Sequence, residues 1–232
     1  MKIRRDIQIW GSVKRHAAAT GRWIRAHKRV SSIGAVVLLL GIAVGVFFLV
    51  SPQEKSPNQE LTGVAGEYQR RLPELKKAVD EKPDDVAAHK NYAVALYATK
   101  DLDGARKQYE EAAKLNDKDA TVYNNLGNVH RDLGNIEESI TAYTKSIELN
   151  PKSLNVYANL ANVQLYRQNN AEAAIATYEK GLKELPDNTQ LQLLLAAAYK
   201  QADQTDNARE TYQTILDREP DNKAAAAGLE RL

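Results

Sequence analysis

Apolar residues follow two different patterns along the chain. From residue 86 onwards they recur three or four positions apart, in runs separated by short polar turns. This spacing predicts a series of amphipathic helices. Residues 33–50, IGAVVLLLGIAVGVFFLV, are instead apolar, without a charge in 18 positions. The second pattern predicts one helix that is apolar on all sides.

The continuous apolar run is long enough to cross a bilayer. As a helix at about 1.5 Å per residue it would extend roughly 27 Å, close to the hydrocarbon thickness. A core helix of this length rarely lacks a polar face. A cleaved signal peptide has a shorter apolar core and small residues before the cut, whereas Pro52 follows FFLVS here. We therefore expect an uncleaved transmembrane helix at residues 31–50.

Charge is distributed unevenly on the two sides of this run. Residues 1–29 carry nine Lys and Arg against one acid, whereas residues 51–232 carry 23 basic and 29 acidic residues. Positive charge marks the cytoplasmic side, so we expect a basic cytoplasmic arm at 1–30 and an exported C-terminal portion. The membrane would then be the plasma membrane of a prokaryote. An Arg-rich, acid-poor start is also typical of mitochondrial import, which leaves a mitochondrial membrane as the alternative.

The basic arm and the apolar run each suggest a binding partner. The arm either lies on anionic lipid or serves only as a topology signal, and nucleic acid is not expected because lipid is the nearer anion. Gly41 and Gly45 have the GxxxG spacing that lets transmembrane helices approach closely, so packing against other membrane helices is a further hypothesis.

The rest of the chain repeats with a period of 34 residues. After a polar linker at 51–60, four units can be aligned, of which the third has one extra residue: 86–119, 120–153, 154–188 and 189–222. Tyrosines and prolines keep the same interval: Tyr109, Tyr143, Tyr178 and Tyr212, and Pro83, Pro151, Pro186 and Pro220, with Asp117 in place of a proline. Each unit reads as helix, turn, helix. In the second, Gly134 suits a left-handed helix cap and Asn135 with Glu138 suits a capping box.

This pattern resembles the tetratricopeptide repeat family, over roughly residues 84–232. The resemblance implies an all-α fold, an α-solenoid of helix pairs, here preceded by the single transmembrane helix. The signature tryptophan is replaced in every unit, by His89, Tyr123, Tyr157 and Gln192, and Ser139 and Gly181 replace expected alanines. Residues 61–85 are interpreted as a degenerate leading helix pair, with Pro73 at a helix start. Residues 223–232 are interpreted as a capping helix with Ala226, Leu229 and Leu232 inward.

Asparagines recur at the repeat interval on the first helices. Asn91, Asn125 and Asn159 form one row, and Asn128 and Asn162 form a second. In the family the first helices line a concave groove, and these rows resemble the asparagine ladders of its peptide-binding members. An amide offers two donors and an acceptor to a peptide backbone. We expect the asparagines to bind peptide, with Lys90 and Arg131 as charge contacts. The alternative is that asparagine here only packs neighbouring units.

Other features narrow the function further. Leu194 and Ala197 occupy the two asparagine rows in the fourth unit, so the polar track ends there in either an apolar pocket or a better-packed end. The carboxylate clamp of chaperone-binding members is not expected. Lys90 and Asn125 fit two of its places, but Val94, Asn155 and Asn159 occupy the others, two of which should be cationic. The chain has no cysteine. It also lacks phosphate-loop, HExxH and GxSxG motifs, and His89 and His130 stand at packing positions.

The sequence therefore predicts a binding protein and not an enzyme, without metal or cofactor. Our hypothesis is a membrane-anchored scaffold whose exported groove binds peptide segments of partner proteins in assembly, secretion or envelope biogenesis. The alternative is a constitutive structural subunit of a larger membrane complex. The architecture alone does not identify the pathway.

Overall fold

A computed structural model describes residues 63–232, and over these residues the chain is helical. The helices are α3 (Gly63–Glu81), α4 (Val86–Ala98), α5 (Leu102–Leu115), α6 (Ala120–Leu133), α7 (Ile136–Leu149), α8 (Leu154–Tyr166), α9 (Ala171–Glu184), α10 (Thr189–Gln201), α11 (Thr205–Arg218) and α12 (Lys223–Leu229). The basic arm, the expected transmembrane helix with Gly41 and Gly45, and the linker lie outside the described residues. Among residues 63–232, no helix combines the length and apolarity needed to span a membrane.

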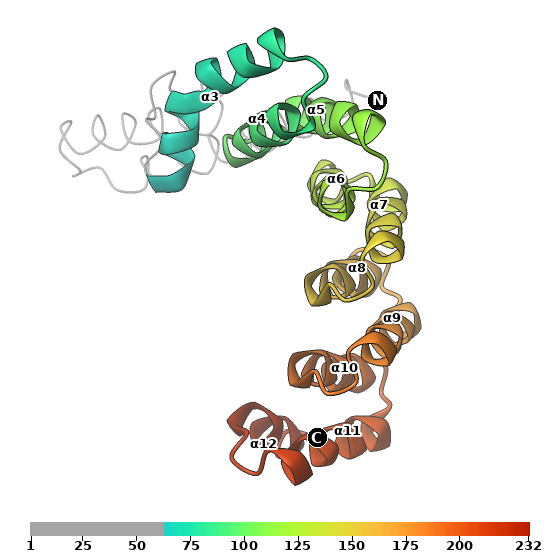
Figure 1. Ribbon diagram of the computed structural model, residues 1–232. Helices are drawn as coiled ribbons and strands as arrows, with labels where there is room; N and C mark the ends of the chain where they lie inside the picture. Colours follow the sequence, from blue (N-terminus) through green and yellow to red (C-terminus); the bar gives the residue numbers. More distant parts are fainter. Residues whose placement is uncertain (1–62) are drawn as a thin grey trace, which may run out of the picture. The chain divides into compact units, whose positions relative to one another are not determined.

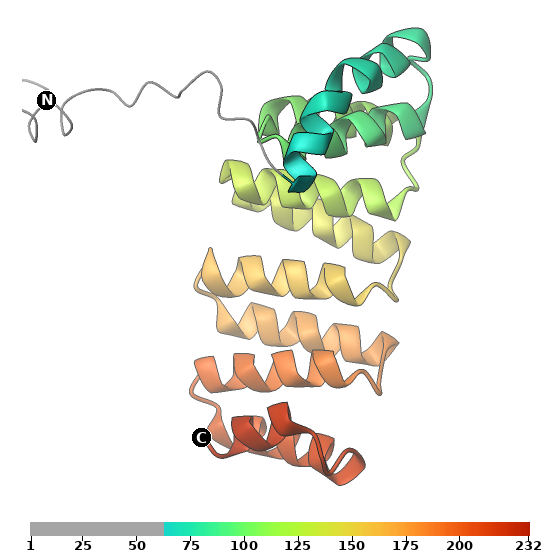
Figure 2. The same ribbon diagram turned by 90° about the vertical axis from the view of Figure 1, so that its left-hand side faces the viewer.

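The helices stack in pairs into two layers. Figure 1 shows α6, α8 and α10 on the inner side of the stack and α7, α9 and α11 on the outer side. Figure 2 looks onto the inner side, where the first helices of the pairs follow one another in chain order. Each helix packs on its sequence neighbours, α6 on α7 and α7 on α8 for example. The α-solenoid expected from the sequence is confirmed for this part of the chain.

Polar caps set most of the helix starts. The side chain of Asp85 accepts from the amides of Ala87 and Ala88, and Asp119 caps α6 in the same way. Gly134 ends α6 with φ of 84°, the left-handed conformation that glycine adopts without steric cost. The expected capping box is wrong: Asn135 precedes α7 but its side chain caps no amide and lies 3.4 Å from the imidazole of His130 instead.

Buried tyrosines of the second helices form the repeating core. Tyr109, Tyr143, Tyr178 and Tyr212 are all buried, and the matching first-helix position carries only small residues, Ala93, Gly127, Ala161 and Ala196. A Cβ atom added at Gly127 would lie 2.5 Å from the Tyr143 ring. The small residue therefore lets the ring and the first helix approach closely. The 34-residue period repeats this contact along the stack.

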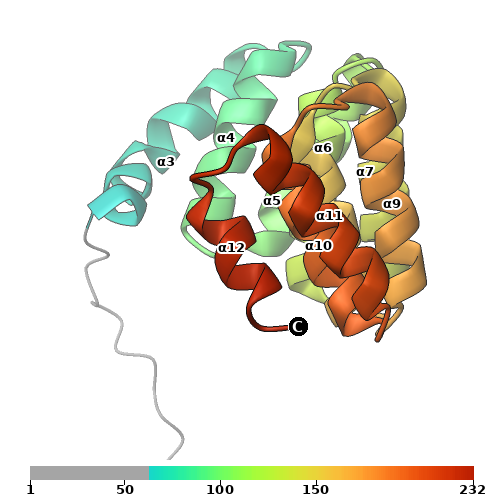
Figure 3. The same ribbon diagram turned by 90° about the horizontal axis from the view of Figure 1, so that it is seen from below.

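The two ends differ from the sequence expectation in detail. Residues 63–81 form one continuous helix, α3, with Pro73 inside it, so the helix pair predicted for residues 61–85 is wrong. Leu75 lies 34 residues before Tyr109 and is buried like it, which makes α3 equivalent to a second helix packed on α4. At the other end, Figure 3 shows α12 in front of the last pair. There Leu229 and Leu232 pack inward as expected, whereas Ala225 is fully buried and Ala226 only half-buried.

Candidate peptide-binding groove

The asparagines expected to bind peptide all lie on inner-layer helices, but in two different environments. Asn91 on α4 and Asn162 on α8 are exposed. Asn125, Asn128 and Asn159 are half-buried between α6 and its neighbours. The equal spacing in sequence therefore does not give the five side chains equal access to a ligand.

Asn128 is the centre of a hydrogen-bond network between helices. Its side-chain oxygen accepts from the hydroxyl of Tyr143 at 2.7 Å, from Arg131 Nη1 at 3.3 Å and from Asn159 Nδ2 at 3.5 Å. Asn159 Nδ2 also donates to Asn124 Oδ1 at 3.1 Å. A carbonyl oxygen has two lone pairs, so this acceptor is already saturated. The side-chain oxygen of Asn128 therefore serves packing between the helices, which is the alternative to peptide binding.

Asn124 on α6 links Asn159 on α8 to Asn125 by hydrogen bonds. Its amide donates to Asn125 Oδ1 at 3.4 Å. Asn124 belongs to this cluster although it stands in neither of the two predicted rows. The signal for it was present, because Asn124 lies 35 residues before Asn159, within one position of the repeat interval.

The charge of Arg131 is balanced inside the protein. Its Nε lies 2.8 Å from Asp132 Oδ1, and its Nη2 donates to Tyr97 at 3.4 Å. The Tyr97 hydroxyl in turn donates to Asp132 at 2.5 Å. Burial alone would raise the pKa of Asp132, but the hydrogen bonds from Arg131 and Tyr97 outweigh it and lower that pKa. Arg131 and Tyr97 lie 34 residues apart, which is one repeat interval. Nothing in the types of the two side chains indicated that they would form a hydrogen bond.

Lys90 is also paired within the fold. Its ammonium group lies 2.6 Å from the carboxylate of Asp119, the residue that caps α6. Burial would raise the pKa of Asp119, but the hydrogen bond and charge of Lys90, together with two helix amides, lower it. Lys90 therefore joins α4 to the start of α6. Its contact with a ligand stays a prediction.

The C-terminal part of the inner layer is apolar. Leu191 and Leu195 of α10 are buried, Leu194 is half-buried and Ala197 is exposed. On the adjacent α8, Tyr166 is 67% exposed, the most exposed aromatic side chain among residues 63–232. A ligand lying along the inner layer from α4 to α10 would contact the exposed amides of Asn91 and Asn162 and, at its α10 end, this apolar region.

The described residues offer no arrangement for metal chemistry. In residues 63–232, no three His, Asp or Glu side chains come together to hold a metal ion. His89 is buried, with Nε2 2.8 Å from the carbonyl of Pro83 and Nδ1 2.8 Å from Gln108. It thus joins the α3–α4 connection to α5.

Comparisons with known proteins identify the repeats. Family models described as tetratricopeptide repeat match residues 118–183 and 165–232, and one described as TPR repeat matches residues 93–131. No curated protein sequence matches the chain significantly.

Several solved structures share the fold at low identity. A crystal structure of MamA is 18% identical, with a TM-score of 0.57, over 69% of this chain and 96% of MamA. YrrB, described as a TPR protein with an unusual peptide-binding site, is 19% identical, with a TM-score of 0.52, over 67% of this chain and 79% of YrrB. The C-terminal part of a TPR repeat-containing protein from Cytophaga hutchinsonii is 18% identical, with a TM-score of 0.62, over 71% of this chain and 65% of that one.

Proposed function

Because residues 93–232 consist of tetratricopeptide repeats, we propose that this protein is an interaction scaffold. Its inner-layer groove binds an extended, largely uncharged segment of a partner protein. Anchoring by residues 31–50 would hold this groove on the exported side of the membrane, where partners are assembled or secreted. Lipid, and neighbouring membrane helices at Gly41 and Gly45, would be its contacts within the bilayer.

The observation that carries the proposal is the combination of exposed amides with paired charges. Asn91 and Asn162 present side-chain donors and acceptors to solvent. Lys90 and Arg131, the two cations expected to contact a ligand, are instead each held by a carboxylate. Such a surface can hydrogen-bond a peptide backbone but offers little attraction to an acidic tail. Binding to the groove should therefore depend only weakly on salt.

The apolar region at the α10 end of the groove would determine the orientation of the bound segment. Tyr166 on α8, the helix that also carries Asn162, and Ala197 on α10 expose apolar surface. Aromatic side chains contribute much of the binding energy at interfaces. We propose that the segment places an apolar side chain at this end and its backbone along α6 and α4. YrrB, which has the same fold, also has a peptide-binding site.

Site-specific photo-crosslinking in native membranes tests the groove. One crosslinking residue replaces Asn162 and a matched one replaces Gln213, an exposed residue of α11 in the outer layer. A discrete partner protein captured from position 162 and not from position 213 is the expected result. Capture from 213 alone would contradict groove binding and favour a constitutive subunit held by its outer layer.

The proposed topology has a separate test. Protease added to the exported side of intact cells or opened envelopes should digest residues 51–232 and spare the basic arm. Complete protection of the repeats would contradict an exported groove, whatever the crosslinking result.

A further inference from the structure

A hollow lies on α6 and α7 away from the groove asparagines. Its volume is about 600 Å³, and its floor is formed by Tyr123, Leu126 and Ala142. Glu137 and Glu138, from the first turn of α7, line the same hollow. An apolar floor beside carboxylates is a surface that the groove proposal does not use.

The charges around the hollow are mainly negative. Glu137 accepts one hydrogen bond, from Gln168 at 3.0 Å, and Glu138 is exposed. Lys145 also lines the hollow, but its ammonium group lies 3.9 Å from Glu148. Arg106 of the neighbouring α5 is bound by Glu110 at 2.7 Å. The nearby cations are therefore already paired.

His130 lies at the wall of the hollow as a mostly neutral group. Burial lowers the pKa of its imidazole, more than Glu138 and Glu110 raise it. Near neutral pH the imidazole consequently adds no cation that would repel a basic ligand. Its ring adds to the surface available for apolar contact.

The corresponding hollow one repeat later has different chemistry. It has a volume of about 360 Å³ and is lined by Ile147, Leu160, Gln164 and Lys180 among others, with no carboxylate. Thr141 in the first hollow and Ala176 in the second lie 35 residues apart at equivalent positions, and both are exposed. Glu137 and Glu138 thus give the first hollow an acidic rim. This rim belongs to residues 123–145 and is not a property of the repeat in general.

We propose that the hollow on α6 and α7 binds a partner segment that presents apolar side chains flanked by arginine or lysine. The apolar side chains occupy the floor of Tyr123, Leu126 and Ala142, and the basic side chains lie beside Glu137 and Glu138. The scaffold then holds two partners at once, one in the inner-layer groove and one on this outer surface. Complementary charge of this kind determines specificity and association rate more than affinity.

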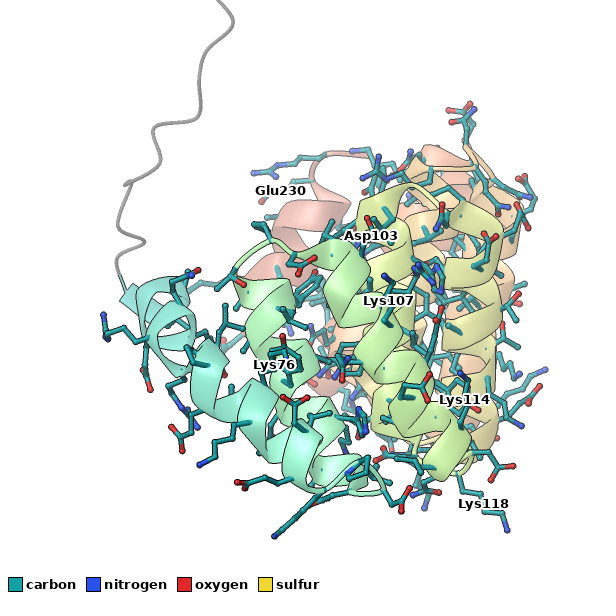
Figure 4. All side chains as sticks on the ribbon, turned by 90° about the horizontal axis from the view of Figure 1, so that it is seen from above. Lys76, Asp103, Lys107, Lys114, Lys118 and Glu230 are labelled. Carbon is teal, nitrogen blue, oxygen red and sulfur yellow. The ribbon has the colours of Figure 1, made fainter. Side chains whose placement is uncertain are left out.

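Figure 4 helps to distinguish this rim from the rest of the outer surface. Asp103, Lys107 and Lys114 follow one another along α5, so this helix carries charges of both signs. On α5 the carboxylates are also paired, Glu111 with Lys114 at 2.7 Å for example. A basic segment is therefore attracted more to the start of α7 than to α5.

The probe for this site is a labelled peptide with two leucines one helical turn apart, flanked by arginines. Its binding to the full-length chain is measured by fluorescence anisotropy. Thr141→Trp, which fills the hollow from an exposed position, should weaken binding at least about tenfold. Ala176→Trp, the equivalent change in the next hollow, should leave it unchanged. Glu138→Lys should weaken binding, and Glu172→Lys, an exposed carboxylate in the first turn of α9, should have little effect.

Three outcomes would overturn the proposal. The wild-type chain does not bind the peptide, Thr141→Trp binds it as tightly as Ala176→Trp, or a control peptide with alanines for the leucines binds equally well. The last result would mean unspecific attraction between opposite charges. None of these measurements involves Asn162, so they stand or fall independently of the groove.

Discussion

The hydroxyl of Tyr143 donates a 2.7 Å hydrogen bond to the side-chain oxygen of Asn128. This bond joins the buried tyrosine of a second helix to the asparagine row of the first. Asn128, one of the predicted ligand-binding residues, therefore takes part in the packing between the two helices of its repeat. Asn128 and Asn162, equivalent in sequence, should therefore differ in what their replacement does.

Asn128→Ala should destabilise the protein by about 1–3 kcal/mol, because it leaves the fully buried Tyr143 hydroxyl without its partner. Asn162→Ala, at the exposed equivalent position, should change the free energy of unfolding by less than about 0.5 kcal/mol. Urea denaturation followed by circular dichroism measures both. Equal effects of the two substitutions would contradict the network centred on Asn128.

Two buried tyrosines should respond in opposite ways to loss of the hydroxyl. The hydroxyl of Tyr157 is buried without a hydrogen-bond partner among the described residues, so Tyr157→Phe should be neutral or stabilise the fold by up to about 1 kcal/mol. Tyr143→Phe removes a formed hydrogen bond and should destabilise it by about 1 kcal/mol. Thermal unfolding of the two variants side by side distinguishes the cases, and a marked loss of stability in Tyr157→Phe would mean that this hydroxyl has a partner.

The Lys90–Asp119 pair predicts a structural role for Lys90. Lys90→Met should destabilise the fold by about 1 kcal/mol, since the pair is largely shielded from solvent. The difference from wild type should shrink in high salt, which screens what remains of the attraction. Lys76→Met, which breaks the exposed pair with Asp80, serves as the control and should have no measurable effect. If groove binding and not stability were lost in Lys90→Met, the lysine would contact ligand after all.

The pKa of His130 predicts a fall in stability on acidification. Burial lowers this pKa below its ordinary value of 6.5, although Glu138 and Glu110 oppose the shift and Arg106 adds to it. The unfolded chain then binds more protons than the folded one as the pH falls below about 6.5, so stability is complete above that pH and declines below it. His130→Gln, which introduces the residue found at the equivalent Gln164, should reduce the decline. Urea denaturation between roughly pH 7 and pH 5 measures it, and an identical decline in both proteins would contradict this role.

The helix pairs could be predicted because their signals are local and repeated. Apolar spacing, capping residues and the tyrosine interval each act within one unit, and four copies reinforce one another. The prediction failed where a unit is incomplete. Residues 63–81 continue as one helix through Pro73, since packing of Leu75 and its neighbours on α4 outweighs the missing backbone donor. The capping box failed because the side chain of Asn135 lies 3.4 Å from the imidazole of His130 and caps no amide of α7.

The 34-residue period alone sufficed to place five asparagines on inner-layer helices. It could not decide which of them remain open to a ligand. Asn128 and Asn159 are engaged because side chains 31 to 35 residues apart meet across the boundary of α6 and α8. Lys90 reaches Asp119 in the same manner. Such contacts depend on the distance and rotation between stacked helices, quantities that no local pattern encodes, and only the tertiary structure determines them.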